Sequence, residues 1–314
     1  MARREGRYPK FKHIHIDCDP LVYKVGFACE EAIHITEDGG RHRTMTDAIA
    51  YCQGMGLDPD NVRKVITPRP WGEVRTEVRK KLRRYKNLFN PSKTHLYLSP
   101  KEYFRHSLTE TYKGNRPSNK PYHYDKIREY LMSVGAKMVH GMEADDVVAI
   151  NHFHLWKKTG NKKGAKDTLI IGEDKDFNNV PGWHYNPYKD KLFFVTTGDA
   201  VVHFYRQLIS GDQADNIQGI PGKGAKAAEK IIPMNAGPIT EKAYWEAAKA
   251  SYLEYAEKNG IPEEEILDQM MLNAHLLWIL WEKEKWFEPP VAEDRCLNLK
   301  WLQKIQSLKD QGRL

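Results

Sequence analysis

Acidic residues gather in four short clusters, and the spacing inside each cluster would place two carboxylates on one side of the chain. The clusters are Asp17/Asp19, Glu143-Ala144-Asp145-Asp146, Asp174/Asp176 and Asp212/Asp215. In extended backbone, side chains at i and i+2 point to the same face, which would pair the acids of the first and third clusters. In the first turn of a helix, side chains at i and i+3 share a face, which would pair the acids of the second and fourth.

Convergence of these clusters would require a counter-charge. Two like unit charges about 4 Å apart repel by roughly 4 kcal/mol at an effective dielectric constant of about 20, whereas a domain is stable by only about 5–15 kcal/mol. Divalent cations are the simplest counter-charge, and ligands that are all oxygen select Mg²⁺ or Mn²⁺ over zinc. Two such cations about 4 Å apart can activate a water and stabilise the leaving oxygen of a phosphoryl transfer. The clusters therefore predict a two-metal site for phosphoryl transfer.

Each cluster also has a purely structural interpretation. The fourth follows a glycine, as helix-capping residues do, and the third follows a predicted strand, as turn residues do. The first cluster fits a strand end and a metal site equally well. The second places three carboxylates within four residues, and their mutual repulsion favours a functional role.

Alternating strands and helices are predicted to position these clusters. Strands are expected at 13–17, 94–98, 137–140 and 168–171, and helices at 20–31, 71–89, 124–134 and from 143 onward. This alternation is typical of an α/β fold with a parallel sheet, in which ligands bind at the carboxyl ends of the strands. Asp17 and Asp174 follow two of these strands, so we expect them to meet. Beyond Pro233, where 233–238 is expected to be a linker, the chain is predicted to be helical.

A glycine-rich segment at 211–232 has the composition of a phosphate-binding turn. Its core, Gly219 to Gly224, is a tight turn between two predicted helices, so backbone N–H groups are exposed there and a helix begins just after it. Lys223, Lys226 and Lys230 add positive charge. An ordinary helix–helix turn is the alternative interpretation.

The chain has a formal net charge of +7, and one predicted helix concentrates positive charge. Between Arg75 and Lys86, seven cations are opposed only by Glu77: Arg75, Arg79, Lys80, Lys81, Arg83, Arg84 and Lys86. The helix is predicted to be either a solvated face or a surface that contacts DNA.

Four motifs, in this order, resemble those of the 5′-nuclease superfamily: Tyr112-Lys113-Gly114-Asn115-Arg116-Pro117, Glu143-Ala144-Asp145-Asp146, Asp174-Lys175-Asp176 and the segment from Gly211 to Gly224. The superfamily includes flap endonucleases, the 5′-nuclease domain of bacterial DNA polymerases and the replicative exonucleases of bacteriophages, and the length of 314 residues is most similar to the last. The resemblance covers residues 13–232. It implies a PIN-like core with a central, mostly parallel sheet flanked by helices, a helical arch, a helix–three-turn–helix and a helical C-terminal part.

The resemblance also implies roles for individual residues. Asp17, Glu143 and Asp145 would surround a first cation; Asp146, Asp174, Asp176, Asp212 and Asp215 would lie around or near a second. Lys113 and Arg116, at the foot of the arch, would steer the scissile phosphate and offset charge in the transition state. Tyr112 would stack on a terminal base. The helix–three-turn–helix would grip duplex DNA by its backbone and hold a potassium ion, using Gly222, Lys223, Gly224, Lys226 and Lys230.

Two positions depart from the superfamily pattern. Ser99-Pro100 stands where the superfamily usually carries an Asp, with Glu102 nearby as a substitute. Cys18 replaces the small residue, commonly Gly, that follows the first Asp. The first departure bears on the geometry of the two-metal site.

The expected organisation is three consecutive parts: a 5′-nuclease core with the arch region at 1–205, the helix–three-turn–helix at 206–235 and a helical C-terminal region at 236–314. The expected function is that of a two-metal 5′→3′ exonuclease or flap endonuclease, acting on DNA with 5′ ends, flaps or nicks in phage-type replication or repair. Two alternatives stay open. One is a nuclease that removes RNA primers from RNA–DNA hybrids, and the other is a non-catalytic protein that binds DNA structures on the same scaffold.

Composition limits the cellular context. No apolar run approaches the roughly 18 residues of a membrane helix, and the basic N-terminus lacks the apolar core of a signal peptide. The four cysteines show no paired spacing. We therefore expect a cytoplasmic monomer, in the host-cell cytoplasm if phage-encoded, with reduced thiols and no zinc site.

Overall fold

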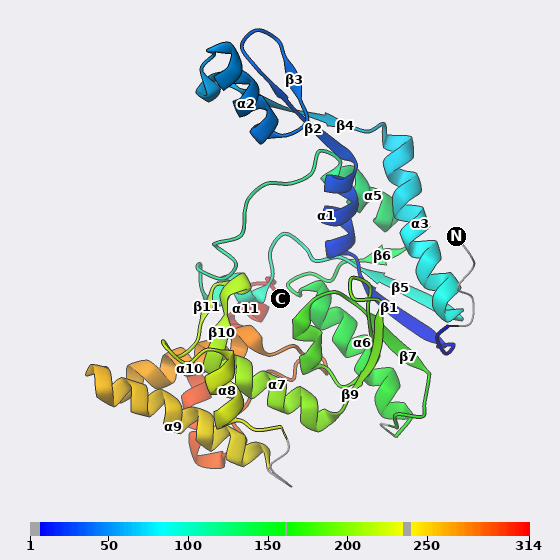
Figure 1. Cartoon of the computed structure of the whole chain (residues 1–314). Coiled ribbons are helices and arrows are strands. Elements are labelled where there is room, and N and C mark those ends of the chain that lie inside the picture. Colours follow the sequence, from blue (N-terminus) through cyan, green and yellow to red (C-terminus); the bar gives the residue numbers. More distant parts are fainter. Residues whose placement is uncertain (1–6, 161, 235–239) are drawn as a thin grey trace. The chain divides into compact units, whose positions relative to one another are not determined.

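The computed structural model describes residues 7–160, 162–234 and 240–314, which form two compact units (Figure 1). The first unit contains the residues up to Cys18, 88–118 and the chain from 136 onward. The second contains 19–87 and 119–135. Among the described residues, no helix is both long and apolar enough to cross a membrane.

A six-stranded sheet forms the centre of the first unit, in the order β6-β5-β1-β7-β8-β9. Its strands are β1 (His13–Asp17), β5 (Lys93–Tyr97), β6 (Ala136–Lys137), β7 (Thr168–Ile171), β8 (Gly182–Asn186) and β9 (Lys191–Val195). Neighbouring strands are parallel except for the β8–β9 hairpin. The predicted mostly parallel α/β sheet is thus confirmed, with β1 between β5 and β7.

Burial explains why the central strands read as apolar runs. All four residues of β7 are buried, as are four of the five residues of β1, which is typical of parallel strands covered on their faces. Helix α6 (Ala144–Lys158) packs on β1 and β7. Its buried Val147 and Val148 belong to the same apolar cluster as Ile170 of β7. The packing places the first turn of α6 near the carboxyl ends of the strands.

Apart from α6, the helices of the first unit share one apolar core. They are α4 (Phe104–Leu108), α7 (Thr197–Ser210), α8 (Ala225–Ile231), α9 (Glu241–Asn259), α10 (Glu263–Leu277) and α11 (Leu299–Asp310), with 3-10 turns η2 (Lys175–Asn179), η3 (Gln213–Asp215) and η4 (Ala292–Asn298). Phe204 of α7, Trp245 of α9 and Met270 of α10 are buried in this core. The described residues beyond 206 therefore pack in the same unit as the central sheet, and the division into three consecutive parts stays a prediction. Much of the expected linker, residues 235–238, lies outside the described residues.

The glycine-rich segment differs from prediction at its start. Asp212 and Asp215 were expected in the first turn of a helix, but Gly211–Asp212 is a short strand, β10, paired with β11 (Ile217–Gln218), and a 3-10 turn fills the space between them. Gly211 has φ of 71°, and a Cβ there would lie 2.2 Å from the nitrogen of Gly219. This close approach of two backbones requires glycine at both positions. A helix does begin directly after Gly224, as predicted.

The second unit combines helices with a small sheet. Its elements are α1 (Asp19–Ala28), β2 (Glu30–Ile35), β3 (Arg41–His42), α2 (Met45–Met55), η1 (Pro59–Asn61), β4 (Arg63–Pro68), α3 (Trp71–Phe89, of which 71–87 lie here) and α5 (Tyr124–Ser133). The antiparallel sheet β3-β2-β4 was not predicted. Helix α3 has the predicted bounds, with Val74 and Val78 buried and its cations exposed. The segment between Leu108 and Tyr124 contains turns and no helix, so a helical arch is not seen there.

Candidate metal centre

Acids from all four clusters come together in the first unit. Asp17 ends β1, Glu143 to Asp146 begin α6, Asp174 and Asp176 lie at η2 just after β7, and Asp212 and Asp215 lie in β10 and η3. The carboxyl group of Asp145 interacts with the charges of Asp17, Asp174 and Glu143. That of Asp176 interacts with the charges of Asp174, Asp212 and Asp215. The predicted meeting of distant acids at the strand ends is thus present in the fold.

Crowding opposes the ionisation of three of these acids. Burial raises the pKa of Asp145 well above its ordinary value, and the charges of Asp17 and Asp174 raise it further. Burial, followed by the charges of Asp174 and Asp212, raises the pKa of Asp176 to about 8. Burial also raises the pKa of Asp174. A bound cation would relieve this strain, and the all-oxygen set fits the hard cations Mg²⁺ and Mn²⁺.

Glu143 behaves in the opposite way because basic side chains surround it. Its side chain accepts hydrogen bonds from Arg105 at 2.9 Å, from the Tyr112 hydroxyl at 3.1 Å and from Lys113. Burial alone would raise the pKa of Glu143, but the charges of Lys113 and Arg105 outweigh burial and lower it to about 2. Glu143 is therefore an ionised carboxylate with fixed partners.

Asp146 is fully buried and has both carboxylate oxygens engaged. Arg105 donates to them at 2.6 and 2.9 Å, and the backbone N–H of Leu280 donates to Oδ1 at 3.0 Å. Arg105 also donates to the carbonyl oxygens of Leu276 and Trp278, at 2.9 and 2.6 Å. Through these contacts Asp146 ties α6 to α4 and to the segment after α10, and its place near the second cation stays a prediction. Sequence reasoning missed Arg105, because its partners lie far from it in the chain.

The loop at 111–116 is fastened to the turn at 213–216. The Tyr112 hydroxyl donates to Asp215 at 3.1 Å, Arg116 pairs with Asp215, and the backbone N–H of Lys113 donates to the Asp215 carbonyl at 2.9 Å. Lys113 Nζ lies 3.7 Å from Asp215 as well as pairing with Glu143. The predicted basic pair thus lies at the carboxylates. The expected stacking of Tyr112 on a base is not supported, because its ring is buried and its hydroxyl holds two acids.

The two departures from the superfamily pattern have structural explanations. The Ser99 hydroxyl accepts a hydrogen bond of 2.9 Å from the first backbone N–H of α6, at Ala144, so it caps the helix that carries Glu143 and Asp145. Cys18 is fully buried, and its backbone N–H donates to the Tyr97 carbonyl at 3.0 Å. Glu102 is exposed. Asp19 belongs to the second unit, where it pairs with Arg128 at 3.0 Å.

The glycine-rich turn presents fewer free cations than its sequence suggested. Gly222 has a positive φ of 78° in this turn, which suits glycine. Lys223 forms an ion pair with Glu254 at 2.8 Å, whereas Lys226 and Lys230 are exposed on α8. No ion pair involves these last two among the described residues. Gly224 immediately precedes α8, which is only seven residues long.

The acidic side chains that the structure describes are not arranged as the ligands of a metal ion. Among the described residues, no group of three or more His, Cys, Asp or Glu side chains is arranged so that it could hold a metal ion. Basic side chains contact the clustered acids instead: Lys113, Arg116, Arg105 and Lys175. The Lys175 ammonium lies 2.8 Å from Asp212. A cation would therefore have to displace part of this basic pairing.

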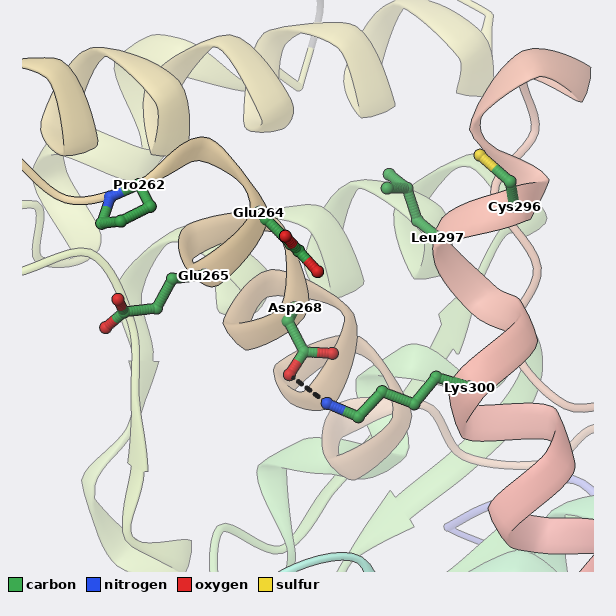
Figure 2. Close-up of a pocket in the computed structure, with 7 residues that line it drawn as sticks. All are labelled: Pro262, Glu264, Glu265, Asp268, Cys296, Leu297 and Lys300. Atoms are coloured by element: carbon green, nitrogen blue, oxygen red, sulfur yellow. Dashed lines mark hydrogen bonds and ion pairs between the residues drawn. The ribbon is translucent and has the colours of Figure 1, made fainter.

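A separate pocket of about 460 Å³ lies between α10 and the residues around Cys296 (Figure 2). It is lined by Glu264 and Asp268 of α10, and Lys300 reaches Asp268 at 2.7 Å. None of the clustered acids lines it. Acids in the first turn of a helix stabilise its N-terminus, which explains the acidity of this pocket.

Comparison with known proteins gives relatives for part of the chain. The chain is 30% identical over 151 residues to a 5′-3′ exonuclease of Buchnera aphidicola, covering 44% of this chain and 51% of the relative. It is 29% identical over 175 residues to a 5′-3′ exonuclease of Mycoplasmopsis pulmonis (50% and 55%), and 29% over 145 residues to DNA polymerase I of Rhizobium leguminosarum (41% and 14%). The chain thus spans about half the length of the exonucleases it matches. No protein-family model matches it.

Among solved structures, the T5 D15 protein co-crystallised with metal ions is similar at a TM-score of 0.44 and 15% identity, covering 84% of this chain and 95% of that one. The T5 5′-exonuclease with bound zinc is similar at 0.41 and 14% (87% and 99%). Fold and site define an α/β protein with an acidic site at the carboxyl ends of parallel strands. Over about half of its length the chain is thus similar in sequence to 5′-3′ exonucleases, in agreement with the resemblance of its motifs.

Proposed function

We propose that the chain is a divalent-metal-dependent 5′-nuclease that hydrolyses phosphodiester bonds of DNA. The observation that carries the proposal is that Asp17 and Asp174, at the ends of the neighbouring parallel strands β1 and β7, meet Asp145 from the first turn of α6. Burial and like charge raise the pKa of Asp145 and of Asp174 there. A folded protein gains nothing from such repulsion unless a ligand relieves it. The homology to 5′-3′ exonucleases supports the same reaction.

The acids divide into two sets around two Mg²⁺ or Mn²⁺ ions. Asp17, Glu143 and Asp145 would hold the first, and the second would be held by Asp174, Asp176, Asp212 and Asp215. When bound, such a pair supplies an activated water and stabilises the leaving oxygen. Asp146 orients Arg105, which in turn holds one oxygen of Glu143.

Lys113 and Arg116 would bind the scissile phosphate. Both already lie at the acids, on Glu143 and Asp215. A phosphate bound between them would pair with the Lys113 and Arg116 side chains. Divalent metal ions would then replace these side chains as the partners of the carboxylates. Arg116 is the more accessible, with 48% of its side chain exposed against 13% for Lys113.

The substrate would be DNA with 5′ ends, flaps or nicks, and RNA–DNA hybrids fit the same site because nothing described reads a 2′-hydroxyl. Lys226 and Lys230 on α8, with the backbone of Gly222 and Gly224, would contact duplex phosphates, and a potassium ion would bind at this turn. Lys223 contributes less, because Glu254 neutralises it. We propose that the chain acts as a monomer.

The test is a cleavage assay with titrated Mg²⁺ on blunt, nicked and 5′-flap duplexes labelled at each end. Asp174→Asn should abolish turnover while DNA binding persists, because it removes a ligand and leaves the basic surfaces intact. Asp310→Asn, at an exposed position on α11, is the matched control and should cleave normally. Wild-type rates from Asp174→Asn would refute the metal assignment.

A non-catalytic DNA-binding protein is the second candidate, favoured by the basic side chains that now occupy the carboxylates. The same assay separates the two. Binding of flap DNA without cleavage at any Mg²⁺ or Mn²⁺ concentration would support this candidate against the nuclease.

A further inference from the structure

One neutral side chain joins two of the clustered acids. Gln207 Nε2 donates to Asp176 Oδ1 at 2.6 Å and lies 3.4 Å from Asp212 Oδ2. Asp176 belongs to η2 and Asp212 to β10, so a single amide connects two elements of the site. Gln207 itself comes from α7 and is buried.

Contacts behind Gln207 determine which end of its amide faces the acids. Gln207 Oε1 accepts from Asn179 Nδ2 at 2.8 Å, and the same Nδ2 lies 3.4 Å from the carbonyl oxygen of Leu277, which can only accept. His203 Nδ1 lies 2.8 Å from Asn179 Oδ1 and donates to it in the tautomer that carries the proton on Nδ1. The Trp281 Nε1–H donates to the Asn179 carbonyl at 2.7 Å, which fixes the backbone.

These contacts form a one-way relay. If the Asn179 amide were flipped, its oxygen would face Gln207 Oε1 and the Leu277 carbonyl oxygen. Three hydrogen-bond acceptors would then meet without a donor, which is unfavourable. Gln207 would then turn as well and would present its oxygen to Asp176 and Asp212. The relay therefore keeps the N–H end of Gln207 on the carboxylates.

Gln207 adds a donor without adding a further positive charge. Lys175 already lies 2.8 Å from Asp212 Oδ2, whereas the amide of Gln207 holds one oxygen of Asp176 and approaches the same oxygen of Asp212 as a neutral group. Partners of this kind, which fix the ligands without touching the metal, commonly affect metal affinity by about 10–100-fold.

We propose that Gln207 is a positioning residue for the second cation, and that the relay from the Leu277 carbonyl through Asn179 sets its orientation. The inference rests on the proposed function, because it takes Asp176 and Asp212 as cation ligands. It goes further in giving α7 and the segment 277–281 a part in metal binding.

Mn²⁺ binding to the full chain without DNA tests the relay, with free Mn²⁺ followed by electron paramagnetic resonance. Gln207→Met should weaken one of the two Mn²⁺ ions by about 10–100-fold and leave the other unchanged. Asn179→Asp should do the same, because its carboxylate would attract the N–H end of Gln207. The side chain of Asn179 bonds Gln207, Leu277 and His203 and is not itself a partner of the clustered acids. Gln306→Met is the matched control, since Gln306 donates to Asp310 at 2.8 Å on an exposed face of α11.

Melting of the metal-free variants separates positioning from a purely structural role. Wild-type Mn²⁺ affinity in Gln207→Met, with or without a lowered melting temperature, overturns the proposal, and the same result in Asn179→Asp overturns the relay. If Gln207→Met fails to fold, Asn179→Asp decides. A wild-type chain that binds no Mn²⁺ refutes both the proposed function and this inference. If the wild-type chain binds two ions and cleaves DNA but the variants bind Mn²⁺ normally, only the relay is refuted.

Discussion

Replacing Arg105 with Met should be among the most damaging single changes to the folded chain. The guanidinium neutralises two buried carboxylates, Glu143 and Asp146, at 2.6–2.9 Å, and it donates to two main-chain carbonyls. Removing one partner of a buried ion pair typically costs about 3–5 kcal/mol, because a charge is left without compensation. Lys113 remains on Glu143, so we assign this loss to Asp146.

A second substitution tests that assignment. The double variant Arg105→Met/Asp146→Leu also removes the Asp146 charge, which Arg105→Met alone would leave buried without a partner. Replacing a buried ion pair with apolar residues often changes the free energy of unfolding little. The Leu280 N–H then loses its acceptor, which costs about 1–3 kcal/mol. We therefore expect the double variant to be more stable than Arg105→Met but less stable than the wild type.

Urea unfolding at pH 7, followed by the fluorescence of the chain's eight tryptophans, measures these differences. Lys300→Met is the control, because it breaks an exposed ion pair with Asp268 and should cost no more than about 1 kcal/mol. The reasoning is refuted if Arg105→Met costs no more than the control, or if the double variant is the less stable of the two.

Three further predictions concern pH, the helix cap and the basic helix. Because the pKa of Asp176 is raised to about 8 from an ordinary 3.8, the folded chain keeps a proton that the unfolded chain releases between these two pH values. The stability of the metal-free protein should therefore fall as pH rises from about 4 to about 8. Calorimetry should find a smaller fall in Asp176→Asn. Ser99→Ala removes the cap on α6 and should lower the free energy of unfolding in urea by about 1 kcal/mol. An unchanged free energy of unfolding would show that the cap does not stabilise the helix. Neutralising four exposed cations of α3 with Gln should reduce the salt dependence of DNA binding, and an unchanged slope would mark a solvated face; the four are Arg79, Lys80, Arg83 and Arg84.

Local patterns predicted the parts of this site that local spacing controls. The ends of β1 and β7, the bounds of α3 and the start of α6 follow from apolar runs and their flanking residues. Gln207 and Arg105 were missed because their roles depend on partners that only the fold brings near, such as Asp176 and Leu276. The 3-10 turn after Asp212 was mistaken for a helix because the backbone contact of Gly211 with Gly219 cannot be read from spacing.

The ion pairs of the 111–116 loop with Asp215 and Glu143 balance charge within the protein itself. Lys113 neutralises Glu143, and Arg116 neutralises Asp215. A nucleic-acid phosphate that draws these two side chains away would uncover negative oxygens, and metal ions bound there would in turn release the two side chains. By thermodynamic reciprocity, each ligand would then tighten the binding of the other to the same degree.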